Sequence, residues 1–301
     1  MTRSWRALGV AMVMTVGASL VVAQEHLPSQ PGGRFGRSIT GAFEGGYDEA
    51  DGSHVFLVGY YNRNLGTPMD IPVGPANHLD PGGPDQGQPT HFMPGRQVGV
   101  FTVKVPKSFG GDQSLTWTIT ANGETTSIPF RLRADYNVSP FEDAAVHNTP
   151  PTVSFAQAGP TLQGPTARMA NAVTQHAVVG TPLPLPLNVQ DDAKYTSGTN
   201  APLKSPRPPV TASWSVYRGP GSVSFNPVDG RVAFTTRTGG QVGEPYSASS
   251  STAATFKAAG DYVLLAVAND YSGTGGGGEV CCWTTAMVRV HVDPAGPAPR
   301  P

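Results

Sequence analysis

Charged side chains are scarce in this chain of 301 residues. Asp, Glu, Lys and Arg make up 14% of it and nearly cancel, to a formal charge of −1, whereas globular domains typically carry about 25% charged residues. Disordered chains combine low hydrophobicity with high net charge. Because 38% of this chain is hydrophobic, it is expected to fold. A basic excess is the usual mark of a nucleic-acid binder, so no nucleic-acid partner is expected.

Uninterrupted helix-forming stretches are also lacking, because 37 Gly and 30 Pro residues punctuate the sequence. These residues cost about 1 and 3 kcal/mol in a helix interior. Between them lie short runs in which apolar and polar residues alternate, as they do along half-buried strands. The sequence therefore predicts an all-β fold, and its length indicates two domains.

Only one long apolar run occurs, and it lies at the N-terminus. Residues 1–23 have the pattern of a signal peptide: Arg3 and Arg6 form a basic start, 16 apolar residues follow, and Val-Val-Ala ends the segment. The run is shorter than the ~20 residues of a spanning helix. We therefore expect export to the periplasm or the extracellular space, with the mature chain starting at Gln24. A retained anchor is the alternative, and no membrane span is expected after signal cleavage.

Cysteine is limited to the adjacent pair Cys281 and Cys282. Three states are open: a vicinal disulfide, one buried and one free thiol, and pairing with another chain. A vicinal bond is awkward, because Cα atoms across a trans peptide lie about 3.8 Å apart while disulfides usually span ~4.4–6.8 Å. Such a bond requires the strand to break here, and the preceding residues Gly275 to Gly278 make a break plausible.

Alternation along the last strand-like run places Cys282 toward the core and Cys281 and Trp283 outward. An outward Trp283 beside a glycine-rich loop is a ligand-binding prediction, because an exposed indole stacks on a sugar or an aromatic partner. The alternative is that Trp283 covers the edge of the sheet.

The chain divides into modules at its Gly- and Pro-rich stretches. A linker at 24–38 precedes an N-terminal β-sandwich module at 39–137, with hairpin turns at Asp51-Gly52 and Asn122-Gly123. Within it, about thirty residues from Gly66 to Gly95 hold too many prolines for regular strand pairing and are expected to form a long loop. A second linker at 138–149 leads to another β-sandwich at 150–293, and a flexible tail is expected at 294–301.

The second module carries a family resemblance. The runs "NTPPTVSF", "VGTPLPLPLNVQDD", "VTASWSVYRGPGSVSF", "TAATFKAAGDYVLLAVAND" and "VRVHV" resemble PKD-type (polycystic-kidney-disease-repeat) immunoglobulin-like domains. The resemblance covers roughly half of the chain. It implies a seven-stranded antiparallel sandwich of extracellular type that serves as a spacer or a binding module, and it implies no catalytic activity. The first module resembles a segment of uncharacterised secreted bacterial proteins, to which no function is attached.

Two acidic groups follow strands of the second module, at Asp191-Asp192 and Asn269-Asp270. If the module is such a sandwich, the loops after its second and sixth strands meet at one end. Calcium takes six to eight oxygen ligands from carboxylates and carbonyls, so these four residues form a predicted calcium site. The alternative is that Asp192 and Asp270 cap turns through bonds to the nearby backbone. No cofactor is required by either reading.

The first module offers Tyr60, Tyr61 and His91 as ligand-binding residues, with packing and turn roles as the alternative. The proline-rich loop also holds His78 and Asp85, which with His91 form the least favoured candidate, a hydrolase site. The spacing of the two histidines fits no tight metal motif. The chain contains no G-x-S-x-G, no H-E-x-x-H and no Walker lysine.

The sequence thus predicts an exported, non-catalytic interaction or structural protein made of two immunoglobulin-like antiparallel β-sandwiches in tandem. Its loops are expected to meet a protein or glycan partner outside the cytoplasm. The first alternative is a carbohydrate-binding accessory module that works with a separate hydrolase. The second is a hydrolase that uses the loop from His78 to His91.

Overall fold

The structure is a computed structural model that describes residues 36–143, 147–156, 159–194, 209–239, 244–270, 272 and 281–296. The predicted signal peptide, most of the first linker and the glycines at 275–278 lie outside the described residues. Those described form strands and three short 3-10 turns, η1 (Ala134–Tyr136), η2 (Met169–Asn171) and η3 (Val228–Gly230), and the all-β prediction is confirmed. None of the described helical segments has the length and apolarity to cross a membrane.

The first sandwich packs two three-stranded sheets around an aromatic core. One sheet holds β1 (Ile39–Asp48), β2 (His54–Asn62) and β6 (Gly95–Val105), and the other holds β4 (Asn77–Asp80), β7 (Leu115–Ala121) and β8 (Glu124–Phe130). Both predicted hairpins are confirmed, since β1 pairs with β2 and β7 with β8. Asn122 and Gly123 turn the second hairpin with φ of 51° and 82°, the left-handed backbone that an Asn-Gly turn adopts. Trp117, at 0% exposed, stands edge-on to Phe101 in the core.

The prediction of one long loop between Gly66 and Gly95 is wrong in part. This stretch contains β4, which pairs with β7, and a short pair formed by β3 (Met69–Asp70) and β5 (His91–Phe92). Prolines cannot donate a backbone hydrogen bond to a strand ladder. In this stretch, hydrogen bonds of one buried side chain hold the backbone in place instead. Asn77 donates to the carbonyls of Ile71 and Pro89 and accepts a bond from the Trp117 indole at 2.9 Å.

The second sandwich also has two sheets. One holds β9 (Thr152–Ser154), β10 (Leu162–Gln163), β12 (Leu183–Asp191), β14 (Val223–Asn226), β15 (Thr236–Thr238) and β16 (Tyr246–Phe256), and the other holds β11 (Val173–Val178), β13 (Val210–Arg218), β17 (Gly260–Asp270) and β18 (Trp283–Asp293). Trp214 fills the core between them at 2% exposed. The antiparallel expectation fails at one edge, where β11 runs parallel to β18. The long stretch of chain between these two strands provides the crossover that parallel pairing requires.

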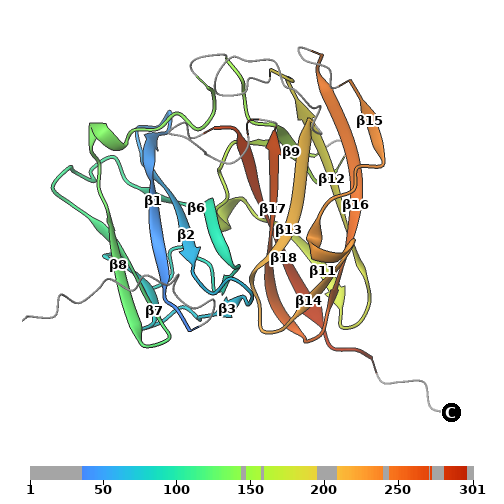
Figure 1. The fold of residues 1–301 in the computed structure, drawn as a ribbon, viewed down its shortest axis with the longest axis horizontal. Coiled ribbons are helices and arrows are strands. Elements are labelled where there is room, and N and C mark those ends of the chain that lie inside the picture. Colours follow the sequence, from blue (N-terminus) through green and yellow to red (C-terminus); the bar gives the residue numbers. More distant parts are fainter. Residues whose placement is uncertain are drawn as a thin grey trace, which may run out of the picture. The chain divides into compact units, whose positions relative to one another are not determined.

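Strand β18 is buried on both faces over its first half. Its even-numbered residues from Ala286 to Val292 face the core of its own sandwich, as the alternation predicts. On the other face, Met287 belongs to the core of the first sandwich, together with Val263 and Leu265 of β17. Figure 1 shows the sheet of β13, β17 and β18 between β6 on one side and β16 on the other. The two sandwiches therefore share a hydrophobic core and lie in one compact unit.

A short extended segment, residues 164–168, bridges the two sandwiches through backbone hydrogen bonds. Its Ala167 carbonyl accepts a bond from the Thr102 amide of β6 at 2.9 Å, and its Ala167 amide donates to the Thr285 hydroxyl of β18 at 3.0 Å. Arg168 adds an ion pair of 2.6 Å with Glu49, just after β1. The segment thus joins a strand of each sandwich. The contact between the sandwiches therefore includes hydrogen bonds and an ion pair as well as apolar packing.

Candidate functional site

Cys281 and Cys282 form a disulfide with each other, across a cis peptide bond that leaves their Cα atoms 3.1 Å apart. Of the three states open from the sequence, the structure has the vicinal disulfide. The bond is enclosed, because the two residues are 7% and 0% exposed and the Cys282 Sγ lies 3.5 Å from the Asn148 carbonyl oxygen. This enclosure leaves Cys281 no open surface on which a ligand could sit.

The expectation of an outward, accessible Trp283 is wrong. Alternation places its indole on the outer face of β18, but that face lies against the first sandwich and Trp283 is 0% exposed. The indole packs beside Gly99 of β6. Stacking on a sugar needs a free aromatic face, so Trp283 is part of the inter-sandwich core and is no ligand platform.

The predicted calcium residues lie at one end of the second sandwich, where each carboxylate caps a turn. Asp191, Asp192 and Asp270 each accept a bond from the backbone N–H two residues later, at 2.9, 3.1 and 2.8 Å. The neighbouring residues Asn148 and Thr149 connect the two loops, donating to Asp270 at 2.6 Å and to Asp192 at 3.0 Å.

Asn269 does not join this group, because it precedes Asp270 in β17 and alternation turns it to the other face. Within the described ranges, no three His, Cys, Asp or Glu side chains are grouped as metal ligands would be. Calcium binding stays a prediction, and the turn bonds of the alternative are present.

The ligand-binding prediction for Tyr60 is wrong, because the ring is 3% exposed and packs against Phe92. Its hydroxyl accepts the Met93 amide at 2.7 Å, and burial raises the pKa of the phenol well above its usual value. Tyr61 points to the other face of β2, where its ring lies under the Arg63 guanidinium at 5.1 Å. His91 pairs with the exposed Asp70 at 2.7 Å across β3 and β5. These three residues each pack or pair with near neighbours.

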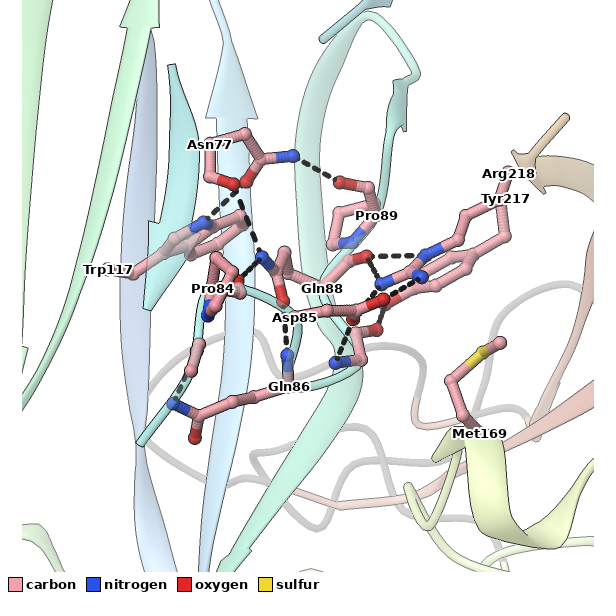
Figure 2. A network of polar contacts seen from close by, with 12 residues as sticks. Asn77, Pro84, Asp85, Gln86, Gln88, Pro89, Trp117, Met169, Tyr217 and Arg218 are labelled. Atoms are coloured by element: carbon pink, nitrogen blue, oxygen red, sulfur yellow. Dashed lines mark hydrogen bonds and ion pairs between the residues drawn. The ribbon is translucent and has the colours of Figure 1, made fainter. Parts of the chain in front are cut away.

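Asp85, part of the third hypothesis, has a structural partner in the other sandwich. Arg218, at the end of β13, donates two hydrogen bonds to its carboxylate, at 2.9 and 2.8 Å. Figure 2 shows this pair together with the Tyr217 hydroxyl, which donates to the Gly87 carbonyl at 2.6 Å. The Arg218 hydrogen bonds lower the pKa of Asp85 below its usual range. The loop that was a hydrolase candidate is thus a docking segment between the sandwiches.

A concave surface of about 430 Å³ lies on the outer face of the sheet that contains β9, β12, β16 and β15. We call it the hydroxyl-amide groove. Small and polar residues line it: Thr152, Ser154, Gly159, Thr161, Asn188, Val189, Gln190, Thr236, Thr238, Ser247, Ala248 and Ser249. None of these described lining residues is charged or aromatic. Its volume is within the range of about 300–1,000 Å³ that is typical of ligand sites.

The strand register builds this groove from the sequence. In β16, residues 246–256 alternate between buried inward positions and outward positions, and the outward positions include Ser247, Ser249 and Ser251. In β12, Asn188 and Gln190 face outward between the buried positions 187, 189 and 191. The sequence reasoning missed this site. The alternation of serine in "YSASSSTAATF" signals an uncharged outer face, but only the pairing of β12, β16 and β15 brings the rows together.

A second hollow, of about 600 Å³, lies beside β1 and β8 in the first sandwich. Apolar residues such as Phe43 and the half-exposed Tyr136 line it together with Arg131, Arg133 and Asp135. Its mixed lining lacks the ordered rows of the hydroxyl-amide groove.

No protein-family model matches the chain, and no curated protein matches it. Solved structures that resemble it include cadherin-like domains 1 to 4 of zebrafish RET, 10% identical, with a TM-score of 0.26, covering 76% of this chain and 41% of that one. A titin fragment, A168–A169, is 10% identical with a TM-score of 0.20, and the match covers 84% of this chain and 98% of that one. Domains 4 and 5 of the S-layer protein SbsC are 10% identical with a TM-score of 0.20, and the match covers 85% of this chain and 98% of that one. The PKD-type assignment stays a prediction.

Proposed function

We propose that this protein is an exported, non-catalytic binding protein, and that its two sandwiches form one support that presents the hydroxyl-amide groove to a partner outside the cytoplasm. The immunoglobulin-like fold is compatible with an interaction module. The groove is the observation that supports the proposal, because its uncharged hydroxyl and amide side chains have the chemistry of recognition rather than of reaction.

A binding surface benefits from rigid placement, and strands hold side chains more firmly than loops do. The groove is built on four paired strands of one sheet. The opposite sheet of the same sandwich is held against the first sandwich by the shared core and by the Arg218–Asp85 pair. The first sandwich therefore supports the second sandwich from the side opposite the groove.

Site-specific photo-crosslinking tests the proposal. A photoreactive residue at Thr161, on the rim of the groove, is expected to capture a partner from the envelope or culture fraction of the producing cell. The same residue at Thr125, exposed on β8 of the first sandwich, is the matched control and is expected to capture nothing specific. Equal adducts at both positions, or none at Thr161, would contradict the proposal.

The hydrolase alternative makes a different prediction. It requires an activity on an extracellular polymer that falls when His91 is replaced by Ala. The non-catalytic proposal expects no hydrolysis by the wild-type chain, so a measured activity that disappears in His91→Ala would replace it.

A further inference from the structure

We propose that the hydroxyl-amide groove binds a neutral carbohydrate, a short stretch of an uncharged glycan chain. This inference rests on the proposed function and names the ligand class of its site. It follows from the order, the free hydrogen-bonding capacity and the absence of charge in the lining.

The polar side chains stand in two cross-strand rows. In one row the register aligns Thr152 of β9, Gln190 of β12, Ser247 of β16 and Thr238 of β15; in the other it aligns Ser154, Asn188, Ser249 and Thr236. Paired strands lie about 4.8 Å apart and each residue advances about 3.3 Å along a strand. The rows are therefore about 6.6 Å apart and form a grid of donors and acceptors on one face.

The hydroxyls of Thr152 and Ser154 donate to the backbone carbonyls of Gln190 and Ala156, but other groups of this grid are open. Among the described residues, the side-chain amides of Asn188 and Gln190 and the hydroxyls of Ser247 and Thr238 make no hydrogen bond. The first sandwich offers a contrast within the same molecule. On β7 and β8 the exposed hydroxyls satisfy one another across the strands, Thr118 with Ser127 at 3.0 Å and Thr120 with Thr125 at 2.9 Å. Similar residue types are thus paired on one sheet and left open on the other.

The chemistry of the open groups fits sugar hydroxyls. Hydroxyl and amide side chains each donate and accept, and a sugar hydroxyl does the same, so each contact is satisfied in either direction. A charged ligand would meet no counter-charge among the described lining residues, because Arg237, between Thr236 and Thr238 on β15, turns to the other face and donates to the Phe234 carbonyl at 3.2 Å.

A protein partner is favoured less by this lining. Protein interfaces draw most of their affinity from Trp, Tyr and Arg anchors, and the groove lining has none of these. With no aromatic platform for a sugar ring, affinity has to come from hydrogen bonds, so the binding is expected to be of modest strength and selective for the pattern of hydroxyl groups.

Affinity electrophoresis of the full exported chain tests the inference with soluble dextran, mannan, laminarin and xylan, and with alginate as an anionic comparison. At least one neutral polysaccharide is expected to retard the protein, and alginate is expected not to. The double variant Asn188→Ala/Gln190→Ala should lower the association constant about tenfold, since it removes two hydrogen-bonding groups of the grid. The control double variant Thr118→Ala/Ser127→Ala should retain wild-type retardation.

Far-UV circular dichroism and the melting temperature establish that both double variants fold. Retardation by no neutral polysaccharide would overturn the carbohydrate assignment, and equal losses in the groove and control variants would overturn the groove as its site. A protein captured at Thr161 in the crosslinking experiment, with no retardation by any glycan, would replace the carbohydrate with a protein and leave the proposed binding function standing. No capture at Thr161 together with no retardation by any glycan would overturn both the carbohydrate assignment and the proposed binding function.

Discussion

Gly99 of β6 lies against Trp283 of β18, in the contact between the two sandwiches. Its φ is 51°, and an added Cβ would overlap the Trp283 indole of the other sandwich. Crowding a packed core typically costs about 1–3 kcal/mol, and the left-handed backbone adds strain for a residue with a side chain. We therefore expect Gly99→Ala to lower the free energy of unfolding by about that amount, measured by urea denaturation.

Gly110→Ala is the matched control for this substitution. A Cβ there would have its nearest neighbour, the Gln113 side chain, at 3.9 Å. Its unfolding midpoint is expected to stay at the wild-type value. Equal midpoints for the two variants would contradict the close contact between Gly99 and Trp283.

The Arg218–Asp85 pair makes stability depend on pH. Hydrogen bonds from Arg218 lower the pKa of Asp85 in the folded chain, whereas an unfolded Asp titrates near ~3.9. The pair's contribution is therefore fully present above about pH 4 and is lost as the pH falls through the lower, folded pKa. We expect Asp85→Asn to lower the melting temperature at pH 7, and the gap from wild type to close as the pH approaches 2. A gap that is constant across this range would show that Asp85 does not act through its charge.

At the scale of elements, the loop ends of the second sandwich depend on Asp270. Its buried carboxylate accepts bonds from Asn148 and from the Ser272 amide and hydroxyl. Leaving such partners unsatisfied costs about 1–3 kcal/mol. Asp270→Ala is therefore expected to reduce the free energy of unfolding by that order, measured in chelator-treated protein so that turn capping alone is assessed.

A calcium titration of the wild-type chain then checks the remaining prediction for this end of the sandwich. A calcium site that uses Asp270 gives a melting temperature that rises at millimolar calcium in the wild type and stays unchanged in Asp270→Ala. A flat response in the wild type would leave capping as the role of Asp191, Asp192 and Asp270.

Alternation and turn chemistry predicted much of the fold, because both act over a few residues. The hairpin at Asn122-Gly123 and the inward face of β18 follow directly from these local rules. The environment of Trp283 could not be predicted in this way. Alternation states which face a residue occupies, and only the packing of the other sandwich decides whether that face meets water.

The same limit explains the other differences. Strand β4 lies in a proline-rich stretch and owes its place to Asn77, whose three side-chain bonds reach residues 6 to 40 positions away. The parallel strand β11 joins β18 from more than one hundred residues earlier in the chain. The hydroxyl-amide groove depends above all on the register of β12 with β16, in which Asn188 pairs with Ser249, a residue 61 positions later. Features that depend on pairing between residues far apart in the sequence cannot be predicted from local sequence patterns.

At the scale of the whole molecule, the shared core predicts cooperative unfolding. Tyr217, Val263, Leu265 and Met287 of the second sandwich belong to the hydrophobic cluster of the first, so unfolding one sandwich exposes apolar surface of the other. We expect differential scanning calorimetry of the full chain to show one transition, with a van't Hoff enthalpy equal to the calorimetric enthalpy. Two separated transitions would show that the sandwiches are thermodynamically independent.

The pairing of β18 also determines when the fold is complete. This strand joins β17 on one side and β11 on the other, and its first residues hold the bridging segment that reaches β6. Until residues 283–293 have left the ribosome, the first sandwich lacks the apolar cover of Met287 and the second lacks a central strand. Contacts between distant parts of a sequence make folding slow. The last strand to be synthesised in either sandwich is thus the one that completes both.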